Sequence, residues 1–157
     1  MPKISPFLWF DTQAEQAAEF YVSVFPNSKI GNLSRYDKEG YEVHKMPDGT
    51  VMSIEFELDG QKFVALNGGP IFKFNESVSF VIPCGTQKDI DYYWDKLSAV
   101  PESEQCGWLK DKYGLSWQVV PTMIGEIMSN PDPEKAGRIT NAMLKMKKLD
   151  IEKLKNA

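Results

Sequence analysis

This chain of 157 residues contains one histidine and two cysteines. Catalytic zinc, nickel and iron sites are built mainly from imidazole, thiolate or several carboxylate ligands, so the sequence supplies few groups for such a metal. The histidine, His44, lies in a polar stretch, where we expect exposure to solvent rather than a role as ligand or base. Cys84 and Cys106 are predicted to be reduced and mostly buried, because two cysteines do not make a disulfide framework.

A surplus of positive charge is also lacking. The 18 Lys and Arg residues face 22 Asp and Glu residues, which gives a net charge of −4 and argues against a nucleic-acid partner. No apolar run approaches the roughly 20 residues that span a bilayer, and the first residues lead into a predicted strand rather than a signal peptide. We therefore expect a cytoplasmic protein with neither a membrane nor a nucleic-acid partner.

An internal repeat is the most informative feature that the sequence does contain. An apolar strand at residues 4–10 precedes Thr12, and another at residues 78–84 precedes Thr86. The two threonines are 86 − 12 = 74 residues apart, and each begins a Thr-x-x-acid pattern that is typical of a helix N-cap. The sequence therefore predicts two copies of a strand followed by a helix.

Each copy continues into a hairpin. Residues 51–58 alternate apolar and polar side chains up to the turn at Gly60, and residues 61–66 return. Residues 106–120 repeat this pattern around Gly114, which is 114 − 60 = 54 positions later. The first copy therefore carries 74 − 54 = 20 extra residues, which we assign to the stretch at 36–50.

These elements predict an α+β fold of two tandem βαβββ modules followed by a C-terminal helical segment. We expect a single domain over 1–157, with a first module at 1–69, a second at 70–121 and helices at 122–157. Asp132 followed by Pro133 predicts the start of a final helix, because Asp caps helices and Pro favours their first position.

Five segments are distinctive: FVALNGGP at 63–70, Ser79-Phe80, CGWLKD at 106–111, GLSWQVVP at 114–121 and KLDI at 148–151. They resemble the PhnB-like group of the vicinal oxygen chelate superfamily, which also contains glyoxalases, extradiol dioxygenases and bleomycin-resistance proteins. That group carries the label 3-demethylubiquinone-9 3-methyltransferase-like. The resemblance implies curved mixed sheets, each forming half of a cup, with two half-cups from one chain or from two enclosing a ligand.

Catalytic members of the superfamily hold a divalent metal in the cup. The resemblance places the corresponding ligand positions at Ile4, Val64, Val78 and Gln118. Aliphatic side chains have no lone pair to donate, and one amide oxygen does not hold a transition metal, so we expect no metal and no cofactor. The methyltransferase label gains no support from the residues, because the glycine-rich turn and parallel βαβ order of the usual S-adenosylmethionine domain are missing.

If the implied ligand positions face the cup, the two-residue period of a strand selects its other lining residues. The expected ligand-binding set is Leu8, Ser53, Glu55, Leu66, Phe80, Cys106, Trp108, Ser116 and Gln118. By the same parity Phe7, Trp9, Phe63 and Trp117 are predicted to point toward the helices.

Glu55 and Gln118 are the catalytic candidates of this set. Glu55 would become a general base if the cup were apolar, and would merely solvate the surface if it lay at a wet rim.

Three functions remain open at this point. The first is a metal-free protein of the bleomycin-resistance kind that binds a small molecule in the cup of a homodimer. The second is a metal-independent enzyme that uses Glu55 and Gln118, including the methyltransferase of the family label. The third is a structural dimer with an empty cup.

Overall fold

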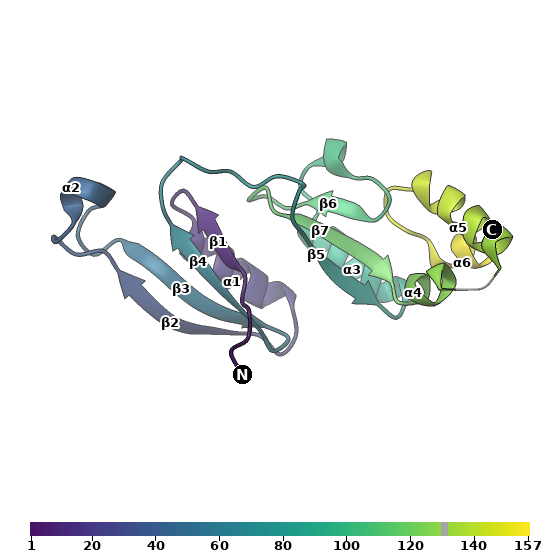
Figure 1. The fold of residues 1–157 in the computed structure, drawn as a ribbon, viewed down its shortest axis with the longest axis horizontal. Coiled ribbons are helices and arrows are strands. Elements are labelled where there is room, and N and C mark those ends of the chain that lie inside the picture. Colours follow the sequence, from purple (N-terminus) through teal and green to yellow (C-terminus); the bar gives the residue numbers. More distant parts are fainter. Residues whose placement is uncertain (130–131) are drawn as a thin grey trace. The chain divides into compact units, whose positions relative to one another are not determined.

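The computed structural model describes residues 1–129 and 132–157 (Figure 1). It divides into two compact units, Met1–Lys73 and Phe74–Ala157. Each unit pairs one mixed sheet with a helix on one sheet face, and the predicted C-terminal segment at 122–157 belongs to the second unit, with residues 130 and 131 outside the described part. The α+β class with two mixed sheets is therefore confirmed. Among the described residues, no helix is both long and apolar enough to cross a membrane.

The first unit contains a sheet of four strands in the order β1-β4-β3-β2, of which β1 and β4 are parallel and the other pairs antiparallel. Its elements are β1 (Phe7–Phe10), α1 (Ala14–Val24), β2 (Lys29–Arg35), α2 (Tyr41–His44), β3 (Val51–Leu58) and β4 (Gln61–Asn67). Helix α1 packs on the sheet, and Ala17 and Tyr21 on its inner face are fully buried. The alternation predicted for residues 51–58 places Ile54 and Phe56 under this helix, where both are buried.

The start of α1 is fixed by a distant side chain rather than by Thr12. The N-cap residue is Gln13, and no side chain of the cap residue bonds the helix. Instead the amide oxygen of Asn67, at the end of β4, accepts from the Ala14 backbone N–H at 2.8 Å. The Asn67 amide nitrogen donates to the carbonyl oxygen of Val51 at 3.1 Å, so one buried side chain joins α1, β3 and β4.

The stretch at 36–50 forms a polar excursion between β2 and β3, which we call the insertion. Its one-turn helix α2 lies between two left-handed residues, Gly40 with φ 78° and Lys45 with φ 56°. Its base is closed where the Tyr36 N–H donates to the Thr50 carbonyl at 2.8 Å. The Tyr36 hydroxyl donates to the Asn67 carbonyl at 2.6 Å, which ties the insertion to the end of β4.

The second unit repeats the arrangement with one strand fewer. Its elements are β5 (Ser79–Cys84), α3 (Gln87–Leu97), the 3-10 turn η1 (Pro101–Ser103), β6 (Trp108–Lys110) and β7 (Ser116–Pro121). Among the described residues its sheet has three strands in the order β5-β7-β6, with β5 parallel to β7, so the predicted second βαβββ module is βαββ. In place of a further strand, the connection after α3 runs along the outer edge of β6. There the Ala99 N–H donates to the Lys110 carbonyl, and Gln105 forms an isolated antiparallel β-bridge with Trp108.

The predicted cap of the second helix is confirmed. Thr86 is the N-cap residue of α3, and its hydroxyl oxygen accepts from the Asp89 N–H at 3.1 Å. The same hydroxyl donates to the Asp89 carboxylate at 2.8 Å, so the two residues of the Thr-x-x-acid pattern bond each other here.

The C-terminal helices are α4 (Met123–Met128), α5 (Pro133–Leu144) and α6 (Ile151–Lys155). Asp132 caps α5 and Pro133 begins it, as predicted. The helices enclose a small core of their own, formed by Ile127, Ile139, Leu149 and Leu154. Backbone bonds fasten the segment between α5 and α6 to the turn before β6, where the Cys106 N–H donates to the Met146 carbonyl at 2.7 Å. The apolar side of α5, which includes Ile139, is thus covered within the second unit.

Trp117 on β7 is a central core residue of the second unit. It is 3% exposed, and its indole N–H donates to the buried carboxylate of Asp111 at 2.9 Å. The other Asp111 oxygen accepts from the backbone N–H groups of Tyr113 and Leu115, so this carboxylate also organises the hairpin turn. The predicted orientation of Trp117 toward the helix is correct.

Replacing Trp117 with alanine should therefore lower the free energy of unfolding by about 3–5 kcal/mol, because the substitution opens a cavity and removes a partner of Asp111. Chemical denaturation measures this loss. The matched control is Trp108→Ala, whose side chain is only half-buried on β6, and it should cost clearly less. Equal losses for the two variants would contradict the assignment of Trp117 to the core.

Candidate functional site

The candidate site lies on the sheet faces that α1 and α3 do not cover, which we call the open faces. On β3 the residues Ser53, Glu55 and Glu57 alternate with the buried Ile54 and Phe56, so they lie on the open face of the first sheet. The strand pairing adds Leu66 opposite Ser53 and Val64 opposite Glu55. The predicted placement of Ser53, Glu55 and Leu66 on this face is correct.

Glu55 is surrounded by polar partners. Its carboxylate oxygens lie 3.2 Å from the Lys62 ammonium and 3.3 Å from the Asn32 amide nitrogen. Its side chain is 33% exposed, so Glu55 lies at a wet surface rather than in an apolar cup, the second of the two alternatives that the sequence left open. A carboxylate in this setting is suited to binding a polar group.

A small hollow of about 90 Å³ opens beside Glu55. It is lined by Lys29, Gly31, Glu55, Phe56, Glu57 and Lys62. Gly31 lies at an irregularity in the β2–β3 register, and a Cβ atom there would lie 3.2 Å from the Glu55 Cβ. Glycine therefore keeps the two strands close at the hollow, and charged side chains of both signs reach its rim.

Leu8 does not belong to the open face, and its predicted placement there is wrong. Leu8 pairs with Ala65 in the parallel β1–β4 ladder and is buried on the helix side of the sheet. Phe7 and Trp9 take the open side instead, opposite Val64 and Leu66 respectively. These two aromatics were predicted to face the helix.

Trp9 is held in place by the segment after β4. Its indole N–H donates to the Gly69 carbonyl at 2.9 Å, and its ring meets the ring of Phe72 edge to face at 5.0 Å. A side chain at Gly68 would collide with the Trp9 ring, so glycine is required there. The open face of the first sheet thus has an aromatic end at β1 and a charged end at β2 and β3.

The second sheet has its own open face. Gln118 lies there opposite Trp108 on β6, and its amide nitrogen donates to the Ser79 hydroxyl at 2.9 Å. Ser116 has the same parity but is almost fully buried. Trp108 and Gln118 thus lie on the open face with the predicted strand parity, whereas Ser116 is not exposed there. Their role in ligand binding stays a prediction.

Phe80 and Cys106 are placed differently from the prediction. Phe80 pairs with Trp117 on the helix side of the sheet, with the ring centroids 5.6 Å apart. Cys106 lies in the turn before β6 with φ 54°, so it shares no strand parity with Trp108. Neither residue joins Gln118 on the open face.

Burial disfavours the thiolate form of both cysteines. Burial raises the pKa of the Cys84 thiol to about 11, with a smaller contribution from the charge of Asp89. Burial also raises the pKa of the Cys106 thiol. Because the thiolate is the reactive form, both side chains are suited to packing rather than to covalent catalysis.

The residues at the metal-ligand positions of the superfamily do not fit a metal. Ile4 and Val78 precede β1 and β5 and are exposed, while Val64 lies on the first open face and Gln118 on the second. Phe7 and Val81, the ladder partners of Val64 and Gln118, are apolar as well. Within residues 1–129 and 132–157, no three His, Cys, Asp or Glu side chains are grouped so that they could hold a metal ion.

We therefore expect purified protein to carry no stoichiometric zinc, nickel or iron and to keep its melting temperature when a chelator is added. Elemental analysis together with thermal unfolding in the presence and absence of the chelator measures both properties. About one metal ion per chain, with a lower melting temperature after its removal, would contradict the assignment.

The architecture of the two units defines the class of protein. It is an α+β protein with glyoxalase-like mixed sheets, each covered on one face by one helix. The family model described as 3-demethylubiquinone-9 3-methyltransferase matches residues 2–120. A solved structure described as a putative 3-demethylubiquinone-9 3-methyltransferase, PhnB protein, from Bacillus cereus is 36% identical, with a TM-score of 0.63 over 76% of this chain and 99% of that one. The chain belongs to this PhnB-like family.

Other comparisons concern the fold alone. Protein PA1353 from Pseudomonas aeruginosa is 12% identical, with a TM-score of 0.56 over 77% of this chain and 98% of that one. No curated protein matches the sequence. Helices α4, α5 and α6 lie beyond the residues that the family model matches, and so does the segment at 148–151 that the sequence analysis included in the resemblance.

Proposed function

We propose that this protein binds a small organic molecule on the open faces of its sheets, without a metal ion, and acts as a homodimer. The observation that carries the proposal is the hollow on the open face of the first sheet, which Glu55 and Lys62 line. Asn32 adds a hydrogen bond to the Glu55 carboxylate. Membership of the PhnB-like family supports a ligand-binding role for such a face.

The chemistry of this face indicates the kind of ligand. Phe7, Trp9, Val64 and Leu66 form an apolar surface at β1 and β4, next to the polar side chains of β3. Ligand sites in proteins combine an apolar wall with a few converging polar groups in the same way. A hollow of about 90 Å³ has room for a polar end group rather than for a whole organic molecule. The proposed ligand therefore has an apolar, partly aromatic body and one polar end.

A ligand screen by thermal shift, followed by mass spectrometry of the hits, tests this proposal. A compound that binds the native state raises the melting temperature, because it adds RT ln(1 + [L]/Kd) to the free energy of unfolding. Both Glu55→Ala and Gln118→Ala should fold normally. Glu55→Ala should weaken a hit bound on the first sheet, and Gln118→Ala a hit bound on the second, by about 1–3 kcal/mol through the loss of a hydrogen bond.

The matched control is Glu19→Ala, which removes the same charge from an exposed position on α1. It should leave the affinity unchanged. A hit that is indifferent to both Glu55→Ala and Gln118→Ala would place the binding site elsewhere.

The exposed apolar residues at the edge of the first sheet support the proposed homodimer. Ile4 before β1, Phe7 on β1, and Ile71 and Phe72 after β4 are all exposed in the single chain. Exposed apolar groups of this kind mark contact surfaces, and closed two-fold dimers are the commonest way to cover them. Light scattering at micromolar concentration should report twice the mass of the chain, and Phe7→Glu should shift the protein toward the monomer. A wild-type monomer under these conditions would contradict the dimer.

Methyl transfer is the second candidate, favoured by the description of the matching family model. Each sheet has a single parallel strand pair, unlike the mainly parallel sheet of the usual S-adenosylmethionine fold. Incubation with S-adenosylmethionine and a demethylated quinol, read by mass spectrometry, distinguishes the two functions. A methylated product with turnover would favour the enzyme, and binding without product would favour the binding protein.

A further inference from the structure

A hollow of about 480 Å³ is formed by α3 together with the segment at 145–153, which runs from the end of α5 into α6. Its lining consists of Gln87, Asp91, Lys145, Met146, Lys148, Leu149, Asp150 and Lys153. Gln87 and Asp91 belong to α3, so the hollow lies on the helix side of the second sheet. It is therefore separate from the open faces, where the ligand site proposed above lies.

Hydrogen bonds fix the backbone around this hollow. The Gln87 amide nitrogen donates to the Leu149 carbonyl at 3.1 Å, and the Gln87 amide oxygen accepts from the Ile151 N–H at 2.9 Å. The Cys106 N–H donates to the Met146 carbonyl at 2.7 Å. The Leu149 side chain is fully buried and anchors the segment in the core of the C-terminal helices. The hollow thus has a fixed shape before any ligand arrives.

The segment that forms the hollow is basic. Residues 145–155 contain five lysines and two acids, a net charge of +3 in a chain whose total is −4. Three of these lysines, Lys145, Lys148 and Lys153, line the hollow, against the two acids Asp91 and Asp150. The lining therefore has one positive charge that its own acids do not balance.

Both acids of the hollow already have partners. Asp91 lies 2.8 Å from the Lys148 ammonium and accepts from the Gln87 amide at 3.2 Å. The hydrogen bond with Lys148 lowers the pKa of Asp91 and raises the pKa of Lys148, so this pair stays charged near neutral pH. Asp150 accepts from the Lys153 backbone N–H at 3.1 Å, and its other oxygen lies 3.8 Å from the Lys153 ammonium. An incoming anion thus meets acids whose charge is already offset.

Lys145 supplies the unbalanced charge. It is the C-cap residue of α5, and its side chain is exposed. Within the part of the chain that the structure describes, Lys145 forms no ion pair. Lys153 is held only by the long contact to Asp150, so its ammonium can also turn toward a ligand. A lysine ammonium has three donors and no acceptor, so both groups are suited to an anion.

We propose that this hollow binds the phosphate group of a small, soluble phosphorylated molecule, with Lys145 and Lys153 as the main donors. A phosphate monoester carries a charge of about −1.5 to −2 at neutral pH, which matches two lysines better than a single carboxylate does. Its oxygens can accept from more than one ammonium group, and lysine is a common phosphate ligand. A volume of about 480 Å³ lies in the range of small-molecule sites, so the rest of the ligand also has room.

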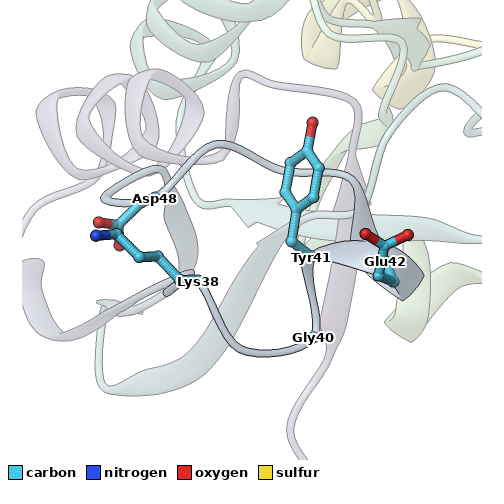
Figure 2. Close-up of a pocket in the computed structure, with 5 residues that line it drawn as sticks. All are labelled: Lys38, Gly40, Tyr41, Glu42 and Asp48. Atoms are coloured by element: carbon cyan, nitrogen blue, oxygen red, sulfur yellow. The ribbon is translucent and has the colours of Figure 1, made fainter.

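A hollow in the insertion has the opposite charge balance. It measures about 390 Å³ and is lined by Lys38, Gly40, Tyr41, Glu42 and Asp48 (Figure 2). Figure 2 shows Lys38 and Asp48 on one side of the insertion and Tyr41 and Glu42 on the other. One lysine against two acids disfavours an anion, so this hollow serves as an internal control.

An NMR titration of the full chain tests the proposal. The probes are inorganic phosphate and phenyl phosphate, with phenol as the uncharged control, all near neutral pH and at constant ionic strength. Backbone amide signals at 145–153 should shift and saturate with both phosphates and stay unchanged with phenol. Signals at 38–48, around the hollow of Figure 2, should not respond. Shifts on β2 and β3 would report on the open face instead, so the two proposals fail separately.

Two double variants remove the same charge from the same segment. Lys145→Gln with Lys153→Gln removes two lining ammonium groups and should weaken phosphate binding roughly threefold to twentyfold, the combined effect of two exposed ion pairs. Lys147→Gln with Lys155→Gln removes two lysines that do not line the hollow. This control should change the affinity by less than about twofold, because salt screens charges that do not touch the ligand.

Three results would overturn the proposal. The first is the absence of saturable shifts at 145–153 with either phosphate. The second is equal weakening by the two double variants, which would indicate a diffuse positive surface rather than a site. The third is binding to vesicles that contain phosphatidic acid without a response to the soluble phosphates, since the segment would then contact a membrane surface.

Discussion

A strand has two faces, and each sheet of this protein has a helix on only one of them. The alternation on β3 states this constraint most clearly, since Ile54 and Phe56 are buried under α1 while Ser53 and Glu55 face away from it. A one-residue shift in register would exchange these sets and bury a carboxylate in the core. The register of the first sheet therefore fixes at once which residues stabilise the unit and which are free to meet a ligand.

The same constraint explains which strand faces could be predicted from the sequence and which could not. Residues 51–58 alternate cleanly, so the pattern alone predicted the open-face position of Glu55. Residues 7–10 read Phe-Leu-Trp-Phe and 79–84 contain mostly apolar side chains, so neither strand carries an alternation that shows which side is outward. The parity of Leu8 and Phe80 had to be inferred from an alignment that started at Ile4 and Val78. Both of those residues lie outside the strands, and the parallel ladders with β4 and β7 settle the opposite parity.

The helix N-caps show a second limit of prediction from short sequence motifs. Thr86 and Asp89 form the predicted capping pair, and both partners lie within one turn of the chain. The related pattern at Thr12 does not cap α1, since Asn67 reaches the same turn from the far end of the sheet. A cap supplied from 53 residues away leaves no signal in a short motif. A buried asparagine next to Gly68 and Gly69 was the available hint, because buried amides need partners for both of their ends.

The two parts that break the internal repeat are held by different forces, and this difference bears on what they can do. The helices after β7 enclose their own apolar core around Ile139 and Leu149, and backbone bonds join them to the turn before β6, so they are part of the stable second unit. The insertion at 36–50 buries little apolar surface and depends on half-buried polar contacts such as those of His44. Segments of this second kind open at a small cost in free energy. The loss of one hydrogen bond is therefore large relative to the contacts that hold the insertion, whereas the same loss is small against the packed core of the C-terminal helices.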